Sequence, residues 1–198
     1  MQSKLLVGIT GGIGSGKTLA SKYFGSLGYT VIYADAAAKQ LYRSNKVLKQ
    51  KLVREFGREI LDSKGNVSGL AARRIILSDR KNIKRVNKIV HPFVVKEINR
   101  RISKIKDRII FVEAAIMFDS GYYRIMDYTL LIYTPKLIRV KRVKDRDKVP
   151  ANEIKRLMSL QMDERKKIKL ADFVIRNDGT REKFNESLNL FLGIIKKL

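Results

Sequence analysis

Apolar runs alternate with helical patterns at the start of the chain. The run at residues 4–10 is short, continuous and followed by glycines, which predicts a buried strand. From residue 17 to residue 27 apolar side chains recur at helical spacing, and Gly28 predicts the end of that helix. Residues 29–35 are β-branched and aromatic and predict a second strand. This order of strand, helix and strand favours a parallel sheet with a right-handed crossover.

The middle of the chain has a different pattern. Helical spacing dominates residues 36–106, and few runs there are typical of strands. Breaks are expected at Gly57, in the turn at 62–66 and at Pro92. These residues therefore predict a helical insertion in an α/β domain.

Strand patterns return in the last part of the chain. Three further strands are predicted, at residues 108–116, 127–134 and 172–177. Pro135 begins a basic helix, and a second helix is expected from residue 152 to residue 167. After a turn at 178–179, Thr180 can cap the last helix.

Length and composition allow one well-packed domain over residues 1–198. The chain is 44% hydrophobic and has no cysteine, which excludes disulfides and thiolate metal sites and fits a reducing compartment. No apolar stretch approaches the roughly 18 residues of a membrane-spanning helix, and the N-terminus has no signal-peptide pattern. We therefore expect a soluble cytoplasmic protein.

The charge is strongly positive, with 43 Lys and Arg against 19 Asp and Glu and a formal net charge of +24. Residues 41–106 alone hold 19 basic and 5 acidic side chains. A basic surface of this kind fits a polyanionic small substrate or nucleic acid, and it also arises with no specific ligand.

A glycine-rich segment carries the clearest chemistry. Gly11-x-x-x-x-Gly16-Lys17-Thr18 matches the P-loop pattern and lies between a predicted strand and a predicted helix. Glycines allow the backbone N–H groups to curl around phosphates, the lysine reaches the β- and γ-phosphates, and the threonine hydroxyl binds Mg²⁺. The predicted ATP contacts in this loop are Gly12, Ile13, Gly14, Ser15, Gly16, Lys17 and Thr18.

Two other interpretations of this glycine-rich segment fit its sequence less well. A dinucleotide-binding spacing that starts at Gly12 would place Lys17 where a small residue must pack closely. A GTPase would need an Asn-Lys-x-Asp sequence, and residues 87–90 fail at the fourth position.

Two carboxylates follow predicted strands, at the edge of the sheet where ligands bind. Asp35 could accept the proton of an attacking hydroxyl, although it could also cap a helix that starts at Ala36. Glu113 closes an apolar strand and could hold Mg²⁺, although it could also be a solvated strand end.

Two arginines are four positions apart on the predicted basic helix. Arg142 and Arg146 therefore share one helix face and could hold a phosphate chain in bidentate fashion. An ordinary basic helix face explains them equally well at this point.

Six sequence segments together resemble the dephospho-CoA kinase family along nearly the whole chain. They are GITGGIGSGKT, VIYAD, HPF at 91–93, EAAIMFD at 113–119, RVKDRD at 142–147 and ADFVIRNDG at 171–179. The resemblance implies transfer of the γ-phosphate of ATP to the ribose 3′-hydroxyl of dephospho-CoA, the last step of coenzyme A synthesis. It also implies a P-loop NTPase fold with a parallel sheet flanked by helices, a helical CoA-binding insertion at 36–106 and a lid at 136–167.

The resemblance also implies roles for individual residues. Asp35 matches the catalytic base, and Lys17 completes the predicted catalytic set with the two lid arginines, Arg142 and Arg146. Asn177 matches a segment near adenine, and His91 matches a histidine near the acceptor. The implied metal is Mg²⁺, with Thr18 and Glu113 as ligands. The expected partners are ATP and dephospho-CoA, without specific nucleic acid or membrane, in a monomer or weak oligomer.

The chain departs from the family pattern at three positions. Tyr33 replaces the first aspartate of Asp-Ala-Asp, and Ala115 and Asp119 replace a proline and a glutamate after the third strand. His91 precedes a proline, and a structural role at a helix start is the stronger interpretation for it. Two rival functions stay open: a kinase for a nucleoside or other small alcohol, and a basic nucleic-acid-binding ATPase.

Overall fold

The computed structural model describes residues 4–198, apart from the side chains of residues 70, 73, 76–78 and 80. Residues 1–3, which the prediction about the N-terminus included, lie outside that range. The chain divides into two units, one of Met1–Ile32 with Lys106–Leu198 and one of Tyr33–Ile105. In the described residues, no helix is both long and apolar enough to cross a membrane.

The first unit is built on a five-stranded sheet in the order β2-β3-β1-β4-β5. Its strands are β1 (Leu5–Thr10), β2 (Thr30–Tyr33), β3 (Ile109–Glu113), β4 (Tyr128–Tyr133) and β5 (Phe173–Arg176). The central strand β1 pairs in parallel with β3 and β4, and β4 pairs in parallel with β5. The register places Ile9 beside Glu113 and Thr10 beside Leu131, so the carboxyl ends of three strands meet at one edge.

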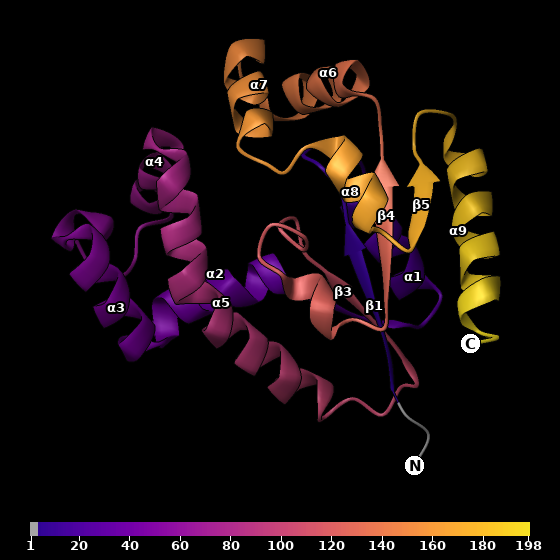
Figure 1. The fold of residues 1–198 in the computed structure, drawn as a ribbon, viewed down its shortest axis with the longest axis horizontal. Coiled ribbons are helices and arrows are strands. Elements are labelled where there is room, and N and C mark those ends of the chain that lie inside the picture. The colour runs from indigo at the N-terminus through magenta and orange to yellow at the C-terminus, as the bar shows by residue number, and fades with distance from the viewer. Residues whose placement is uncertain (1–3) are drawn as a thin grey trace. The chain divides into compact units, whose positions relative to one another are not determined.

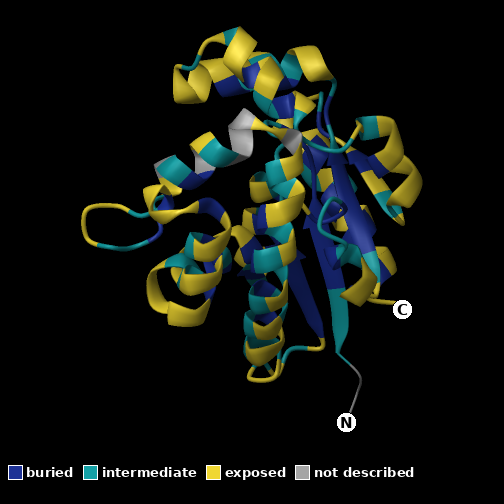
Figure 2. Ribbon diagram, turned by 60° about the vertical axis from the view of Figure 1, so that its left-hand side comes forward, coloured by how far each residue is buried: buried dark blue, intermediate teal, exposed yellow. Residues whose placement is uncertain are grey.

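Alternate residues of the strands bury one face of the sheet against two helices, α1 (Lys17–Ser26) and α9 (Arg181–Ile195). Phe24 of α1 stacks on Phe111 of β3 with ring centroids 4.2 Å apart. Phe191 of α9 packs against the same Phe24 ring at 6.0 Å. Figure 2 shows the resulting division, with buried strands and helices exposed on their outer sides. The predicted strand–helix–strand unit is confirmed.

Three further helices follow β4 in the first unit: α6 (Lys136–Asp147), α7 (Ala151–Ser159) and α8 (Glu164–Leu170). Figure 1 shows α6 and α7 beyond the carboxyl end of β4. They form a small core of their own from Val143, Ile154 and Met158. Ile13 of the glycine-rich loop packs against this core, which ties the helices to the loop.

The second unit is helical among its described residues. It contains α2 (Ala34–Ser44), α3 (Lys46–Phe56), a short 3₁₀ helix (Arg58–Ile60), α4 (Gly69–Ser78) and α5 (Arg80–Ile102). The other three α-helices all pack against α5. The predicted break at Gly57 is confirmed, because that residue ends α3 with φ of 78°.

The predicted break at Pro92 is wrong, because α5 continues through this residue. Proline removes one N–H donor from the helix. Buried residues nevertheless recur every four positions on both sides of it, at Val86, Val90, Val94 and Ile98. Their packing holds the helix together, and His91 therefore lies inside a helix rather than at its start.

The helix predicted from residue 152 to residue 167 is in fact two helices, α7 and α8. Asp163 caps α8 by accepting a hydrogen bond from the backbone N–H of Arg165 at 2.9 Å. The residues just before it turn to other partners: Gln161 bonds the glycine-rich loop and Met162 bonds Asp119. These contacts between distant parts of the chain interrupt the helix.

The second strand ends earlier than the sequence predicts. β2 stops at Tyr33 and α2 begins at Ala34, so Asp35 lies in the first turn of α2. Tyr33 occupies the N-cap position, and Asp35 is therefore neither the strand end nor the cap. The alanine-rich sequence that follows Tyr33 favours helix from its first residue.

Candidate active site

The glycine-rich loop of residues 11–16 connects β1 to α1. Gly14 and Gly16 have φ of 79° and 98°, which residues with a side chain rarely adopt. Gly16 is also the N-cap of α1, so the loop ends at the positive pole of that helix. Lys17, the first residue of α1, is half-buried.

The other two glycines of the loop, Gly11 and Gly12, lie close to groups from neighbouring elements. A Cβ atom on Gly11 would lie 2.6 Å from the carbonyl oxygen of Ile132, and one on Gly12 would collide with Nη1 of Arg139. The loop backbone thus touches β4 on one side and α6 on the other. Gly14 and Gly16 are required by their φ angles and Gly11 by the closeness of backbone; a side chain at Gly12 would displace the ends of Arg139 and Glu164.

Two buried side chains, those of Asn177 and Thr134, lie within hydrogen-bond distance of the loop backbone. The carbonyl oxygen of Ser15 accepts a hydrogen bond from Nδ2 of Asn177 at 2.8 Å and lies 3.0 Å from Oγ1 of Thr134. Asn177 is only 5% exposed. Its amide therefore supports the phosphate loop, and the contact with adenine implied by the resemblance stays a prediction.

Thr18 and Glu113 form a polar pair beside the loop. The threonine hydroxyl donates to Oε1 of Glu113 at 2.8 Å. Glu113 is 6% exposed, and its Oε2 has no hydrogen-bond partner among the described residues. A buried carboxylate oxygen without a partner is unfavourable unless a ligand supplies one.

This pair fits a magnesium ion. Carboxylate and hydroxyl oxygens are suitable ligands, and Mg²⁺ keeps waters and substrate phosphates in its other positions. The described residues contain no cluster of three or more metal-binding side chains, so a magnesium ion at this pair would take most of its ligands from elsewhere. Such sparse coordination is usual where the phosphates of a nucleotide complete the shell.

The two predicted lid arginines lie on adjacent turns of α6. Arg146 is exposed and forms a bidentate pair with Asp147, with Nε and Nη2 at 2.6 and 2.8 Å, which raises the pKa of the arginine. Arg142 is half-buried. The pKa of Asp178 is lowered mainly by its hydrogen bond to Arg176 and further by the charge of Arg142.

Four polar residues that the sequence analysis did not select also contact the loop region. Oε1 of Gln161 accepts a hydrogen bond from the Ile13 N–H at 3.1 Å. Arg139 and Glu164 lie against Gly12, and Lys167 joins them in an ionic cluster through Glu164. Gln161, Glu164 and Lys167 recur every three residues, which indicates one shared helix face. This spacing is hard to recognise in the sequence because basic residues surround it.

Two predicted site residues belong to the second unit. Asp35 is exposed in α2, and burial together with the charge of Asp35 raises the pKa of Tyr42 to about 12. His91 is half-buried in α5, and burial lowers its pKa, which favours a neutral ring at physiological pH. The approach of Asp35 and His91 to the phosphates stays a prediction.

The structure gives the departures from the family pattern local roles. Tyr33 is the N-cap of α2, and Ala115 lies in the turn after β3. Asp119 accepts a hydrogen bond from the backbone N–H of Met162 at 2.8 Å. Asp119 thereby fixes the segment that leads into α8.

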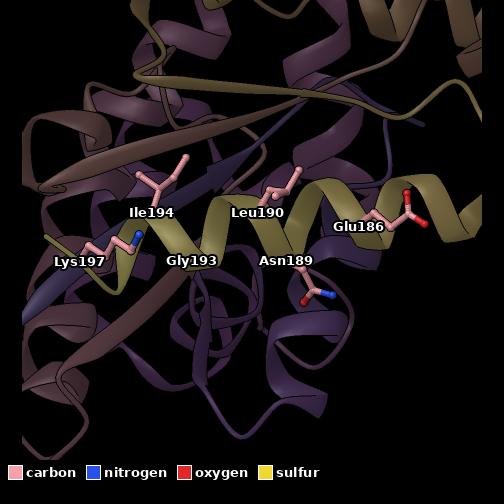
Figure 3. Close-up of a pocket in the computed structure, with 6 residues that line it drawn as sticks. All are labelled: Glu186, Asn189, Leu190, Gly193, Ile194 and Lys197. Atoms are coloured by element: carbon pink, nitrogen blue, oxygen red, sulfur yellow. The ribbon is translucent and has the colours of Figure 1, made fainter.

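A shallow surface hollow also lies along α9, and Figure 3 shows the side chains that line it. They are Glu186, Asn189, Leu190, Gly193, Ile194 and Lys197. None of them is a predicted site residue, and their charged and polar members do not converge on one group as the loop amides do. The phosphate loop is therefore the better candidate site.

Comparison with known proteins gives the family. The sequence profile of dephospho-CoA kinase matches residues 5–183. The chain belongs to the dephospho-CoA kinase family. It is 29% identical over 193 residues to the dephospho-CoA kinase of Fusobacterium nucleatum, covering 98% of this chain and 100% of that protein. It is 30% identical over 195 residues to that of Carboxydothermus hydrogenoformans, covering 97% and 93%.

Solved structures agree with this family. A Thermus thermophilus protein superposes with a TM-score of 0.82 at 31% identity, covering 96% of this chain and 97% of its own. A dephospho-CoA kinase from Campylobacter jejuni superposes with a TM-score of 0.67 at 26% identity, covering 97% of both chains. A shikimate kinase from Acinetobacter baumannii, at 12% identity and a TM-score of 0.56, shares the fold alone. The predicted fold class and the resemblance to this family are confirmed.

Proposed function

We propose that the protein transfers the γ-phosphate of ATP to the ribose 3′-hydroxyl of dephospho-CoA and so completes coenzyme A synthesis. Membership of the family carries the choice of acceptor. The single structural observation that carries the chemistry is the phosphate loop with the Thr18–Glu113 pair beside it. This pair places a hydroxyl and a buried, half-satisfied carboxylate next to the start of α1.

The loop and its surroundings bind the donor. The amides of residues 12–16 and the positive end of α1 face the phosphates, and Lys17 reaches the β- and γ-phosphates. Thr18 and Glu113 hold Mg²⁺, which when bound neutralises charge on the β- and γ-oxygens. Asn177 keeps the loop in place through Ser15 and lies close to the adenine.

The same proposal assigns roles to the residues that contact the acceptor and the transferred phosphate. The 3′-oxygen of dephospho-CoA forms a bond to the γ-phosphorus, and the bond from that phosphorus to the β–γ bridging oxygen breaks, which releases ADP. Asp35 orients the hydroxyl and accepts its proton. Arg142 and Arg146 spread positive charge over the transferred group, and Arg146 must leave Asp147 to do so.

The division of the chain follows from these roles. Residues 36–106 bind the acceptor, with His91 nearby and the basic side chains of this segment attracting its pyrophosphate. Residues 136–167 act as the lid that carries the arginines. A cytoplasmic location and a monomer or weak oligomer complete the proposal.

A coupled ADP-release assay tests the function. We expect turnover with dephospho-CoA and much less with nucleosides or nucleoside monophosphates. Turnover with a nucleoside but not with dephospho-CoA would refute the proposed acceptor. ATP hydrolysis stimulated by DNA or RNA would favour the nucleic-acid-binding alternative, and retention on DNA would not, because any protein with this charge binds polyanions.

A further inference from the structure

A buried ionic cluster packs against the phosphate loop and has no part in the mechanism above. Arg139 of α6 and Lys167 of α8 are 4% and 1% exposed. Both cations contact the same carboxylate oxygen, Oε1 of Glu164, at 3.4 Å and 3.3 Å. The side chain of Glu164 is 22% exposed. We call these three residues the buried triad, after its two buried cations.

Two members of the buried triad, Arg139 and Glu164, lie directly against the loop backbone. Nη1 of Arg139 lies 3.5 Å from the carbonyl oxygen of Ile13. A Cβ atom on Gly12 would collide with that nitrogen and lie 2.6 Å from Oε1 of Glu164. The absence of a side chain at Gly12 therefore leaves room for the charged groups to reach the loop.

The charges of the buried triad do not balance. It has two cations and one carboxylate, and within the described part of the chain neither cation has a second carboxylate partner. Nε of Arg139 is also buried without a hydrogen-bond partner among those residues. Burying a charge without full compensation is unfavourable, so this arrangement favours an additional anion nearby.

We propose that the phosphate chain of ATP is that anion, and that the buried triad is a positioning site for the nucleotide. The free protein carries one excess positive charge behind Gly12 and Ile13. Bound phosphates compensate this charge through the thin glycine backbone, without direct contact with the triad. This inference rests on the proposed function only in requiring ATP in the loop, and it is independent of the acceptor.

The first test replaces a cation of the triad by a side chain of similar length. The Lys167→Met variant should bind ATP about 10- to 100-fold more weakly by calorimetry, the range expected for loss of one charge that acts on the phosphates through the protein at an effective dielectric constant of about 20. Its stability to urea without nucleotide should be equal to or greater than that of the wild type, because the remaining pair is neutral. Lys167→Arg should restore ATP binding. Lys169→Met, at an exposed position of the same helix, is the matched control and should change neither property.

The second test removes the negative charge of the buried triad instead of a positive one, and its outcome does not depend on the Lys167→Met variant. Glu164→Gln leaves both cations uncompensated, so the melting temperature without nucleotide should fall. The rise in melting temperature on adding ATP should then exceed that of the wild type. A structural role alone would lower stability equally with and without ATP.

The outcomes separate this inference from the proposed function. If the wild type binds ATP and Lys167→Met binds it within twofold of the wild type, the inference is overturned. An equal loss of stability in Glu164→Gln with and without ATP also overturns it. If instead the wild type binds ATP and the variants behave as expected but dephospho-CoA is not phosphorylated, the proposed function alone fails.

Discussion

Replacing Asn177 by alanine distinguishes support of the phosphate loop from contact with adenine. The change removes the 2.8 Å hydrogen bond to the Ser15 carbonyl. The hydroxyl of Thr134 lies 3.0 Å from that carbonyl and 2.8 Å from the carbonyl oxygen of residue 177, so its one proton can turn to Ser15 when the amide is lost. The cost is therefore that of one buried hydrogen bond and a small cavity, about 1–2 kcal/mol. For a chain of this size we expect the melting temperature to fall by about 2–8 °C.

Nucleotide binding by the same variant completes the test. If Asn177 holds the loop, binding of both ATP and inorganic triphosphate should weaken, because both need the loop amides. If Asn177 only contacts adenine, ATP binding alone should weaken and the melting temperature should not change. Calorimetry with the two ligands therefore decides between the roles.

A double-mutant cycle gives the control. Thr134→Val removes the second donor and leaves the shape of the side chain almost unchanged. The one proton of the Thr134 hydroxyl lies within reach of two carbonyl oxygens, that of Ser15 at 3.0 Å and that of residue 177 at 2.8 Å. If the hydroxyl donates to Ser15, the double variant leaves that carbonyl without a donor, and its loss of stability should exceed the sum of the single losses by about 1–3 kcal/mol. Additive losses in urea unfolding would refute the view that these two side chains share one acceptor.

Three further changes test the remaining roles. Lys17→Ala should lose most turnover while the protein stays folded, and an unchanged kcat would remove Lys17 from the mechanism. Glu113→Gln keeps an acceptor for the Thr18 hydroxyl but removes a buried charge, so the stability of the protein should not fall. Its activity should fall, and the Mg²⁺ concentration needed for half-maximal rate should rise. An unaltered Mg²⁺ requirement would exclude Glu113 as a ligand. Asp35→Asn should lower kcat far more than it weakens ATP binding, because the amide cannot accept the proton. The variant should lose little stability, because Tyr33 rather than Asp35 occupies the N-cap of α2. Activity within a few-fold of the wild type would exclude Asp35 as the base.

Local features of the chain allowed much of this molecule to be predicted. The apolar runs that became β1, β3 and β4 are buried strands because their side chains must leave water, whatever surrounds them. The phosphate loop follows from glycines and a helix start that are adjacent in the sequence. The same holds for Thr180, which caps α9 by accepting a hydrogen bond from Lys183, three residues away.

The tertiary structure decided the features that depend on distant partners. The bond from Asn177 to Ser15 joins residues 162 positions apart, and the bond from Ile13 to Gln161 spans 148. Pro92 stays inside a helix because the residues around it are packed on one face. In each case the free energy comes from groups that the fold brings together, and local propensity carries no information about those groups. The sequence thus determined the loop that meets the phosphates, and the packed chain determined which side chains hold that loop in place.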